Sequence, residues 1–439
     1  MKAWIYRVIA REVSRLSRYA DALIELTADG DRAGTLLAAV DAPVRQVARL
    51  DDPEAVPVAE PNYRRVILLN GTFNHSLDIQ ALLIRLHGRM GRGDRVSVIV
   101  YNSYLAWLFR LADRLGWRHG PRATTFITRT DLHGLARLSG FDVVRLRPAV
   151  YAPWHFFGLG TLLNRLMPSV PGLRWLSLVA VTTLRPIRPD TADRPSLSIV
   201  IPARNERGNI EDALRRMPDF RAETEIIFVE GNSSDGTWEE IERVAAEWHG
   251  REGRRVVALR QTGRGKADAV RLGFSRATGD VLTILDADLT MPPELLPRFF
   301  DAYCAGLGDF INGTRLVYPM EGEAMQFLNR LANIGFAKGL SWILETPLAD
   351  TLCGTKLLAR RDYERFVAWR SDFGDFDPFG DFELLFPASV LGLGVIDVPV
   401  AYRARTYGTT NIHRFRDGLT LARMSIIGFL HIRLGAGPR

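Results

Sequence analysis

Between residues 196 and 290, short runs rich in β-branched residues alternate with helical patterns, and this alternation restricts the possible folds more than any other feature. The runs are LSIVIP, EIIFVE, RVVALR and VLTILDAD, separated by patterns such as NIEDALRRM and WEEIERVAAEW. Strands that alternate with helices form α/β sheets whose strands are mainly parallel. The same alternation occurs upstream, in RVILLNG, LDIQALLIRLHGRM, RVSVIVYN, FDVVRLRP and LSLVAVTTLRP. The sequence therefore predicts two α/β units.

The two units are separated by RPIRPDTADRPS, in which three prolines stand among polar residues. Such a segment is typical of a linker, and a chain of 439 residues is too long for one ordinary core. We predict an N-terminal domain at residues 1–185, a linker at 186–195, a C-terminal domain at 196–412 and a terminal segment at 413–439.

The formal charge is +7 and the pI about 9.6, and nearly all of the excess comes from arginine. Nucleic acid, phosphates and anionic lipid surfaces all attract such a chain, but an arginine-rich genome gives the same composition. Cys304 and Cys353 form no CxxC pair, which favours a reducing cytoplasm over a disulfide framework or a structural zinc site.

The membrane-related patterns are short. The N-terminus lacks the uninterrupted apolar stretch of a signal peptide, so no export is predicted. The most apolar windows, at residues 173–184 and 424–432, fall short of the roughly 20 residues that cross a bilayer. We expect a cytoplasmic protein whose membrane contact, if it has one, is peripheral on the inner face.

Polar residues follow the first two strands of the C-terminal unit. Pro202-Ala203-Arg204-Asn205-Glu206 ends the first, and Glu230-Gly231-Asn232-Ser233-Ser234-Asp235 ends the second. Ligands of parallel sheets bind beyond the carboxyl ends of strands, so Glu206, Glu230 and Asp235 are predicted to face one crevice. The alternative is a structural role as loop and helix-capping residues.

Two further loops carry candidate ligand-binding groups. Gly263-Arg264-Gly265-Lys266 precedes a helix, with glycines that admit a ligand and cations suited to phosphate. The fourth strand runs into Asp286-Ala287-Asp288, where two carboxylates one residue apart can hold a divalent cation, Mn²⁺ or Mg²⁺. Such a cation would bridge the diphosphate of a nucleotide-sugar and neutralise the leaving group.

IPARNE, VEGNSSDGT, GRGKADAVRLGF and LDADLTMPPE resemble, in order and spacing, the motifs of family 2 glycosyltransferases, which have the GT-A (Rossmann-like) fold. The likeness covers residues 196–412 and is strongest to polyprenyl-phosphate (dolichyl-phosphate) sugar synthases, whose usual Gln is replaced by Thr290. It implies a UDP- or GDP-linked donor and a glycosyltransferase of the EC 2.4 class. The implied donor-binding residues are Pro202, Arg204, Asn205, Glu206, Glu230, Ser233, Asp235, Gly265, Lys266, Asp286, Ala287 and Asp288, with the metal on Asp286 and Asp288.

The same resemblance implies an acceptor side. Gly313-Thr314-Arg315, Asn329-Arg330 and the segment from Asp350 to Lys356 look like the acceptor-binding motifs of those synthases. The resemblance places Arg403 and Arg405 near the donor or acceptor phosphates. The alternative is that both arginines lie on a strand face exposed to solvent. Guanidinium groups suit phosphate oxygens.

The resemblance implies an inverting, in-line displacement at the anomeric carbon, with Asp288 among the catalytic residues. A hydroxyl acceptor would require a base, for which Asp381 or Glu383 is the candidate, whereas a lipid phosphate is already an anionic nucleophile. The acceptor is therefore polyprenyl phosphate or a glycan hydroxyl, and nucleic acid is not expected as a partner.

The terminal segment combines Arg414, Arg416, Arg423 and Arg433 with apolar residues. A basic amphipathic segment of this kind can lie on a membrane or dock on its own domain.

The stretch at residues 66–186 resembles class I methyltransferases, which hold S-adenosylmethionine on a GxG loop after the first strand. Here the corresponding residues 22–32 lack GxG, and Thr27 and Asp29 would crowd the cofactor. We expect a degenerate methyltransferase-like α/β domain without S-adenosylmethionine. Three functions remain open: a glycosyltransferase, a bifunctional methyltransferase and glycosyltransferase, and a catalytically silent binding protein.

Overall fold

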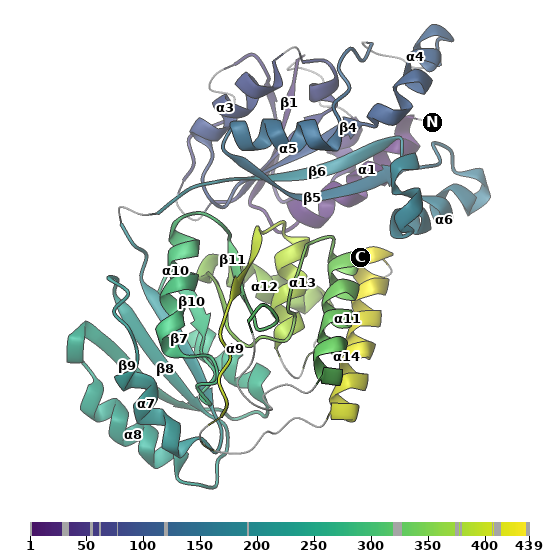
Figure 1. The fold of residues 1–439 in the computed structure, drawn as a ribbon. Helices are drawn as coiled ribbons and strands as arrows, with labels where there is room; N and C mark the ends of the chain where they lie inside the picture. Colours follow the sequence, from purple (N-terminus) through teal and green to yellow (C-terminus); the bar gives the residue numbers. More distant parts are fainter. Residues whose placement is uncertain are drawn as a thin grey trace. The chain divides into compact units, whose positions relative to one another are not determined.

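The protein was analysed as a computed structural model (Figure 1). It describes residues 2–28, 35–52, 56–60, 63–76, 78–117, 122–190, 193–318, 327–373, 377, 380–405, 407 and 414–435; of residues 35, 327–329, 372 and 414–417 only the backbone is described. The chain divides into two compact units. The first holds Met1–Arg188, Val390–Gly392 and His431–Ala436, and the second holds Pro189–Ser389, Leu393–Leu430 and Gly437–Arg439.

The first unit contains a six-stranded sheet in the order β2-β1-β3-β4-β6-β5, in which β6 runs in the direction opposite to the other five strands. Its strands are β1 Ala22–Thr27, β2 Arg45–Arg49, β3 Arg65–Asn70, β4 Arg95–Tyr101, β5 Phe141–Val150 and β6 Val179–Pro186. The apolar runs of β3 and β4 are buried, as expected for strands covered on both faces. The predicted α/β class is therefore confirmed here.

Helices cover both faces of this sheet. They are α1 Lys2–Ser17, α2 Thr35–Ala39, α3 Ile79–Arg89, α4 Ala106–Arg114, α5 Arg129–Leu138 and α6 Leu159–Leu166. Apolar residues of α3 and α5 pack on one face, and those of α1 and α2 pack on the other. Helices α4 and α6 contribute nothing to either core.

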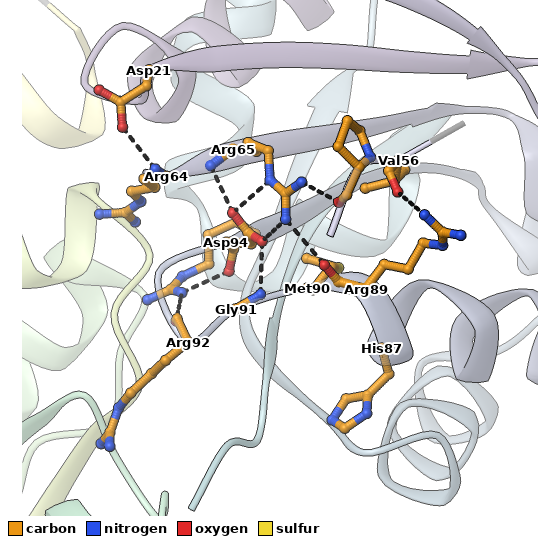
Figure 2. A network of polar contacts seen from close by, with 12 residues as sticks. Asp21, Val56, Arg64, Arg65, His87, Arg89, Met90, Gly91, Arg92 and Asp94 are labelled. Carbon is orange, nitrogen blue, oxygen red and sulfur yellow. Dashed lines mark hydrogen bonds and ion pairs between the residues drawn. The ribbon is translucent and has the colours of Figure 1, made fainter. Parts of the chain in front are cut away.

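Charged residues at the amino ends of β3 and β4 form a buried ion pair (Figure 2). Asp94 accepts hydrogen bonds from the backbone N–H groups of Arg65 and Gly91, each at 2.8 Å, and its Oδ2 lies 2.6 Å from Nη2 of Arg65. The same guanidinium also donates to the carbonyls of Pro57 and Arg89. A buried arginine that is paired and hydrogen-bonded in this way is structural, so part of the arginine excess serves the fold.

The second unit contains a seven-stranded sheet in the order β13-β11-β12-β10-β7-β8-β9. Its strands are β7 Leu197–Ala203, β8 Thr224–Glu230, β9 Arg254–Arg260, β10 Val281–Ile284, β11 Phe310–Thr314, β12 Lys356–Ala359 and β13 Val395–Pro399. The strands β7 to β10 are the four apolar runs of the sequence, and they are parallel. β12 alone is antiparallel, between β10 and β11.

The helices of the second unit are α7 Ile210–Arg215, α8 Thr237–Trp248, α9 Lys266–Arg276, α10 Leu296–Cys304, α11 Phe327–Leu344, α12 Arg360–Phe373, α13 Asp381–Val390 and α14 Arg414–Gly428. Apolar residues of α7, α8 and α10 join the strands in one large core. Helix α9 crosses β7 closely, because Gly273 leaves room for the side chain of Val200.

The terminal helix α14 packs beside α11, and the rings of Trp342 and Phe429 stack at 5.3 Å. Leu421 and Met424 of α14 are buried, whereas Leu419 and Ile426 are exposed. The predicted amphipathic segment thus covers its own unit with part of its apolar surface. No helix in the described part of the chain is long and apolar enough to cross a membrane.

The predicted methyltransferase likeness of the first unit stays a prediction. Most of the loop on which it depends, residues 29–32, lies outside the described residues. Glu25, the acidic residue of β1, is buried and accepts a hydrogen bond from the Asn70 side chain at 3.4 Å. The expected absence of S-adenosylmethionine likewise remains a prediction.

Candidate active site

The loops after β7 and β8 are fastened to each other. The backbone N–H of Asn205 donates to Oγ of Ser233 at 3.0 Å, and the N–H of Ser234 donates to Oδ1 of Asn205 at 2.9 Å. Asn205 has a φ of 55°, a left-handed conformation that asparagine tolerates better than most residues. The two strand ends that the sequence predicted to share a crevice therefore meet.

The carboxylates of these two loops have different roles. Glu230 is buried and accepts from the N–H of Ser233 at 2.5 Å, so it shapes its own loop. Asp235 accepts from the N–H of Thr237, the first residue of α8, at 3.1 Å, but the N-cap of this helix is Gly236. Burial raises the pKa of Asp235, but hydrogen bonds from Thr237 and Arg207 outweigh this effect and hold the pKa below its usual value. These contacts give both carboxylates a structural role, and their part in donor binding stays a prediction.

The two aspartates after β10 are each paired with a basic side chain. Asp286 forms an ion pair with Lys266, the first residue of α9. Asp288 Oδ2 lies 2.7 Å from Nη2 of Arg405, and Nη1 of Arg405 lies 3.3 Å from Oε1 of Glu206. Ala287 between the aspartates is buried. Residues from four separate segments therefore meet at the end of β10.

The charges of this cluster influence one another. Burial favours neutral Lys266, but Asp286 and Asp381 outweigh it and raise the pKa of the lysine. Burial also opposes ionisation of Asp286, yet the Lys266 ammonium lowers the pKa of that carboxyl. At Glu206 burial prevails over Arg405, so the pKa of this carboxyl is raised. Alternating charges at a strand end suit a ligand that carries a diphosphate and a cation.

Thr290 has a role that the sequence did not reveal. Its hydroxyl donates to Oδ1 of Asp288 at 2.7 Å, and its backbone N–H lies 3.1 Å from the same oxygen. Where the related synthases carry Gln, this side chain orients the second aspartate. Because the hydroxyl binds Oδ1, the other oxygen of Asp288, Oδ2, accepts the hydrogen bond from Arg405.

The two candidate bases are both engaged by cations. Asp381, at the start of α13, lies 2.5 Å from Nζ of Lys356, which is fully buried. Glu383 forms ion pairs with Arg271, at 3.2 Å, and with Arg370. These two arginines could not be identified as partners from the sequence, because they lie on the separate helices α9 and α12. Both carboxylates are therefore committed to ion pairs.

The predicted phosphate-binding cations fall into two groups. Arg315 is partly buried and makes a bidentate pair with the buried Asp350, with Nε to Oδ2 at 2.7 Å and Nη2 to Oδ1 at 3.0 Å. Lys356 is fully buried. In contrast, Arg330, Arg403 and the predicted donor-side residue Arg204 are exposed. Exposed guanidinium groups can meet an incoming phosphate, whereas Arg315 first has to leave Asp350.

Gly354 lies against the aspartates, although it is 68 residues away from Asp286 in the sequence. A Cβ added to Gly354 would lie within 3.0 Å of both the Asp286 carboxylate and Nζ of Lys266, closer than real Cβ atoms come. The glycine of the DTLCGTK segment therefore leaves space for the Lys266–Asp286 pair.

We expect Gly354→Ala to lower transfer by about tenfold, because the methyl group displaces Asp286 or Lys266 from its position; a misplacement of about 1 Å can cost up to 10²-fold. Gly335→Ala on α11 is the matched control, since its Cβ would meet nothing within 4 Å. The measurement is the turnover rate together with the melting temperature. Equal turnover of the two variants would contradict this placement.

Comparison with known proteins extends this picture. The profile of glycosyl transferase family 2 matches residues 198–366. The dolichol-phosphate mannosyltransferase of Pyrococcus furiosus is 33% identical over 142 residues, which are 32% of this chain and 38% of the relative. This chain thus spans well under half the length of that enzyme.

A solved structure, the glucosyl-3-phosphoglycerate synthase of Mycobacterium tuberculosis with UDP, aligns with a TM-score of 0.39 and 19% identity, over 56% of this chain and 82% of that one. The dolichyl-phosphate hexose transferase of Haloferax volcanii is 30% identical over 242 residues, which are 54% of this chain and 96% of the relative. The C-terminal unit has the mainly parallel α/β sheet expected from the sequence, and the family profile matches within this unit. On the family profile and this nearly full-length relative, the chain belongs to glycosyl transferase family 2.

Proposed function

We propose that this protein is a metal-dependent inverting glycosyltransferase that moves a sugar from a UDP- or GDP-linked donor to polyprenyl phosphate. The observation that carries the proposal is the cluster of Asp286, Asp288, Lys266 and Arg405 at the end of β10. Its charges match a nucleoside diphosphate and a divalent cation. The names of the relatives, which act on dolichyl phosphate, support the same acceptor.

The side chains at this site fit Mn²⁺ or Mg²⁺. Asp286 and Asp288 supply hard oxygen ligands, and the described residues contain no group of three or more His, Cys, Asp or Glu side chains that could hold a metal ion. Magnesium commonly uses one or two carboxylates together with substrate phosphates and water, so two aspartates suffice. When bound, the metal neutralises charge on the leaving diphosphate.

The remaining residues bind and orient. Lys266 and Arg405 are within reach of the aspartates, and their positive charges can also stabilise the departing phosphates. Glu206 and Thr290 hold Arg405 and Asp288 in place through the contacts described above. On the acceptor side, exposed Arg330 is the group proposed to receive the lipid phosphate.

The ion pairs of Asp381 and Glu383 favour a phosphate acceptor over a glycan hydroxyl. A hydroxyl must lose its proton to a base, and both candidate bases already neutralise neighbouring cations. A phosphate acceptor is an anion and needs no base. The carboxylate of Asp381 then acts by positioning Lys356. Transfer to a glycan hydroxyl is the second candidate function.

The test is product formation with polyprenyl phosphate in detergent across a panel of UDP- and GDP-sugars. We expect one donor to give a glycolipid in the presence of Mn²⁺ or Mg²⁺, and we expect a chelator to stop the reaction. Transfer to a sugar hydroxyl alone, or activity unaffected by the chelator, would refute this assignment. A lipid acceptor also implies that the protein works peripherally at the inner face of the cytoplasmic membrane.

A further inference from the structure

Two segments of the first unit project from the same edge of its sheet. One follows β4 and comprises residues 103–117, with α4 in its middle; the other joins β5 to β6 and contains α6. Because β4 and β5 are parallel, both segments leave the carboxyl ends of strands, and Figure 1 shows α4 and α6 near the same ends of β5 and β6. The side chain of Asn102 donates to the carbonyls of Trp175, at 2.6 Å, and Ser177, at 2.7 Å, which ties the two segments together.

These segments expose an unusual number of large apolar side chains. We call the set the aromatic surface. Its members are Tyr104, Trp107, Leu111, Leu115, Trp117, Trp154, Phe156, Phe157, Leu159, Leu162, Leu166 and Trp175. Among the described residues, every exposed tryptophan and phenylalanine of the protein belongs to it. Large apolar side chains exposed in such number on two segments that are hydrogen-bonded to each other indicate a binding surface, whereas single exposed apolar residues need no explanation.

The backbone at two of these aromatic residues is in a strained conformation. Phe156 and Phe157 have φ values of 43° and 50°, which bulky residues rarely adopt, and the side chain of Phe157 is fully exposed. Helix α4 likewise has no buried residue at all. Strain of this kind persists at functional sites when a partner requires it.

The charges around the aromatic surface are almost all positive. Residues 143–189 contain no aspartate or glutamate, and residues 103–117 contain only Asp113. Arg110, Arg114 and Arg165 are exposed beside the apolar side chains. A second copy of this chain would bring these arginines against one another, which disfavours self-association through this surface.

We propose that the aromatic surface binds an anionic lipid bilayer. Tryptophan, tyrosine and phenylalanine partition into the interfacial region of membranes, and flanking arginines are attracted to anionic headgroups. The choice of a bilayer over a protein partner rests in part on the lipid acceptor proposed above. The surface is distinct from α14, the segment in which the sequence suggested membrane contact.

The test is sedimentation of the full-length protein with vesicles of phosphatidylcholine, with and without phosphatidylglycerol. We expect binding to the anionic vesicles, weakened by salt because exposed charges are screened. Trp107→Glu and Phe157→Glu should each lower the vesicle affinity about tenfold or more, since each loses the burial of a large apolar side chain. Leu138→Glu is the matched control, because Leu138 is exposed at the end of α5 in the same unit, and its affinity should stay within about twofold.

The readouts separate this proposal from the proposed function. Turnover of a short, water-soluble polyprenyl phosphate should be equal in the wild type, Trp107→Glu and Phe157→Glu, since both residues belong to the first unit and the proposed active-site residues belong to the second. If the wild type turns over this acceptor but does not bind vesicles, the proposed membrane-binding surface is refuted and the proposed function is not. If the wild type binds vesicles but transfers no sugar, the proposed function is refuted and the membrane-binding surface is not. A third outcome is that the wild type forms dimers that Trp107→Glu dissociates without any change in vesicle binding. This result would identify the surface as a subunit interface and refute the proposal.

Discussion

Asp288→Asn is expected to reduce sugar transfer by at least about 10³-fold while the protein stays folded. Asp288 follows β10, and its side chain contacts Thr290 and Arg405 rather than the apolar core. Asparagine retains the size of the side chain and an oxygen for Thr290, but it removes the negative charge that a divalent cation requires. Arg405 would remain paired with Glu206.

The measurements are product formation, Mn²⁺-dependent nucleotide binding by calorimetry, and the melting temperature. Asp280→Asn is the matched control, because Asp280 is exposed immediately before the same strand and its side chain accepts hydrogen bonds from Ser196. We expect that control to keep most of its activity. Normal nucleotide binding and transfer by Asp288→Asn would show that the metal is held elsewhere.

Arg330→Ala is expected to impair transfer to polyprenyl phosphate by about 10²-fold, mainly through a higher KM for the acceptor. Its exposed guanidinium, on α11, makes a long hydrogen bond, 3.4 Å to the carbonyl of Leu316, and its exposure lets it meet a phosphate. Charge-assisted bidentate contacts to phosphate are among the strongest hydrogen bonds in proteins. Lys338→Ala is the matched control, since Lys338 is an exposed cation on the same helix.

Asp381→Asn provides the contrast, and we expect only a modest loss of turnover per folded molecule. The variant leaves the buried ammonium of Lys356 without its carboxylate, and breaking a buried pair typically costs about 3–5 kcal/mol of stability. Activity therefore has to be measured at a temperature at which the variant is folded. Asp381→Asn combined with Lys356→Met should recover part of the lost stability.

A hydroxyl acceptor predicts the reverse order of these variants. Loss of a base typically costs about 10²- to 10⁴-fold, and no acceptor phosphate would then require an arginine. An inactive but folded Asp381→Asn beside a near-normal Arg330→Ala would move the assignment to a sugar hydroxyl.

The sequence was sufficient for the local features of the C-terminal unit. The runs that became β7 to β10 were recognisable because burial on both faces demands continuous apolar residues, and the polar residues after them emerge where parallel strands end. The aspartate pair and its position at a strand end were therefore readable from the chain alone. The short antiparallel β12 was not, since a four-residue run carries no sign of its direction.

Only the tertiary structure decided which charges meet. Arg405 reaches Asp288 across 117 positions and Glu206 across 199, and Glu383 is held by arginines of two other helices. The sequence offered Asp381 and Glu383 as bases, but it could not reveal that both are ion-paired. The aromatic surface was equally hidden, because an apolar helix pattern is the same whether a core covers it or not. Periodicity determines the type of an element, whereas contacts between distant residues depend on how the elements are connected and packed.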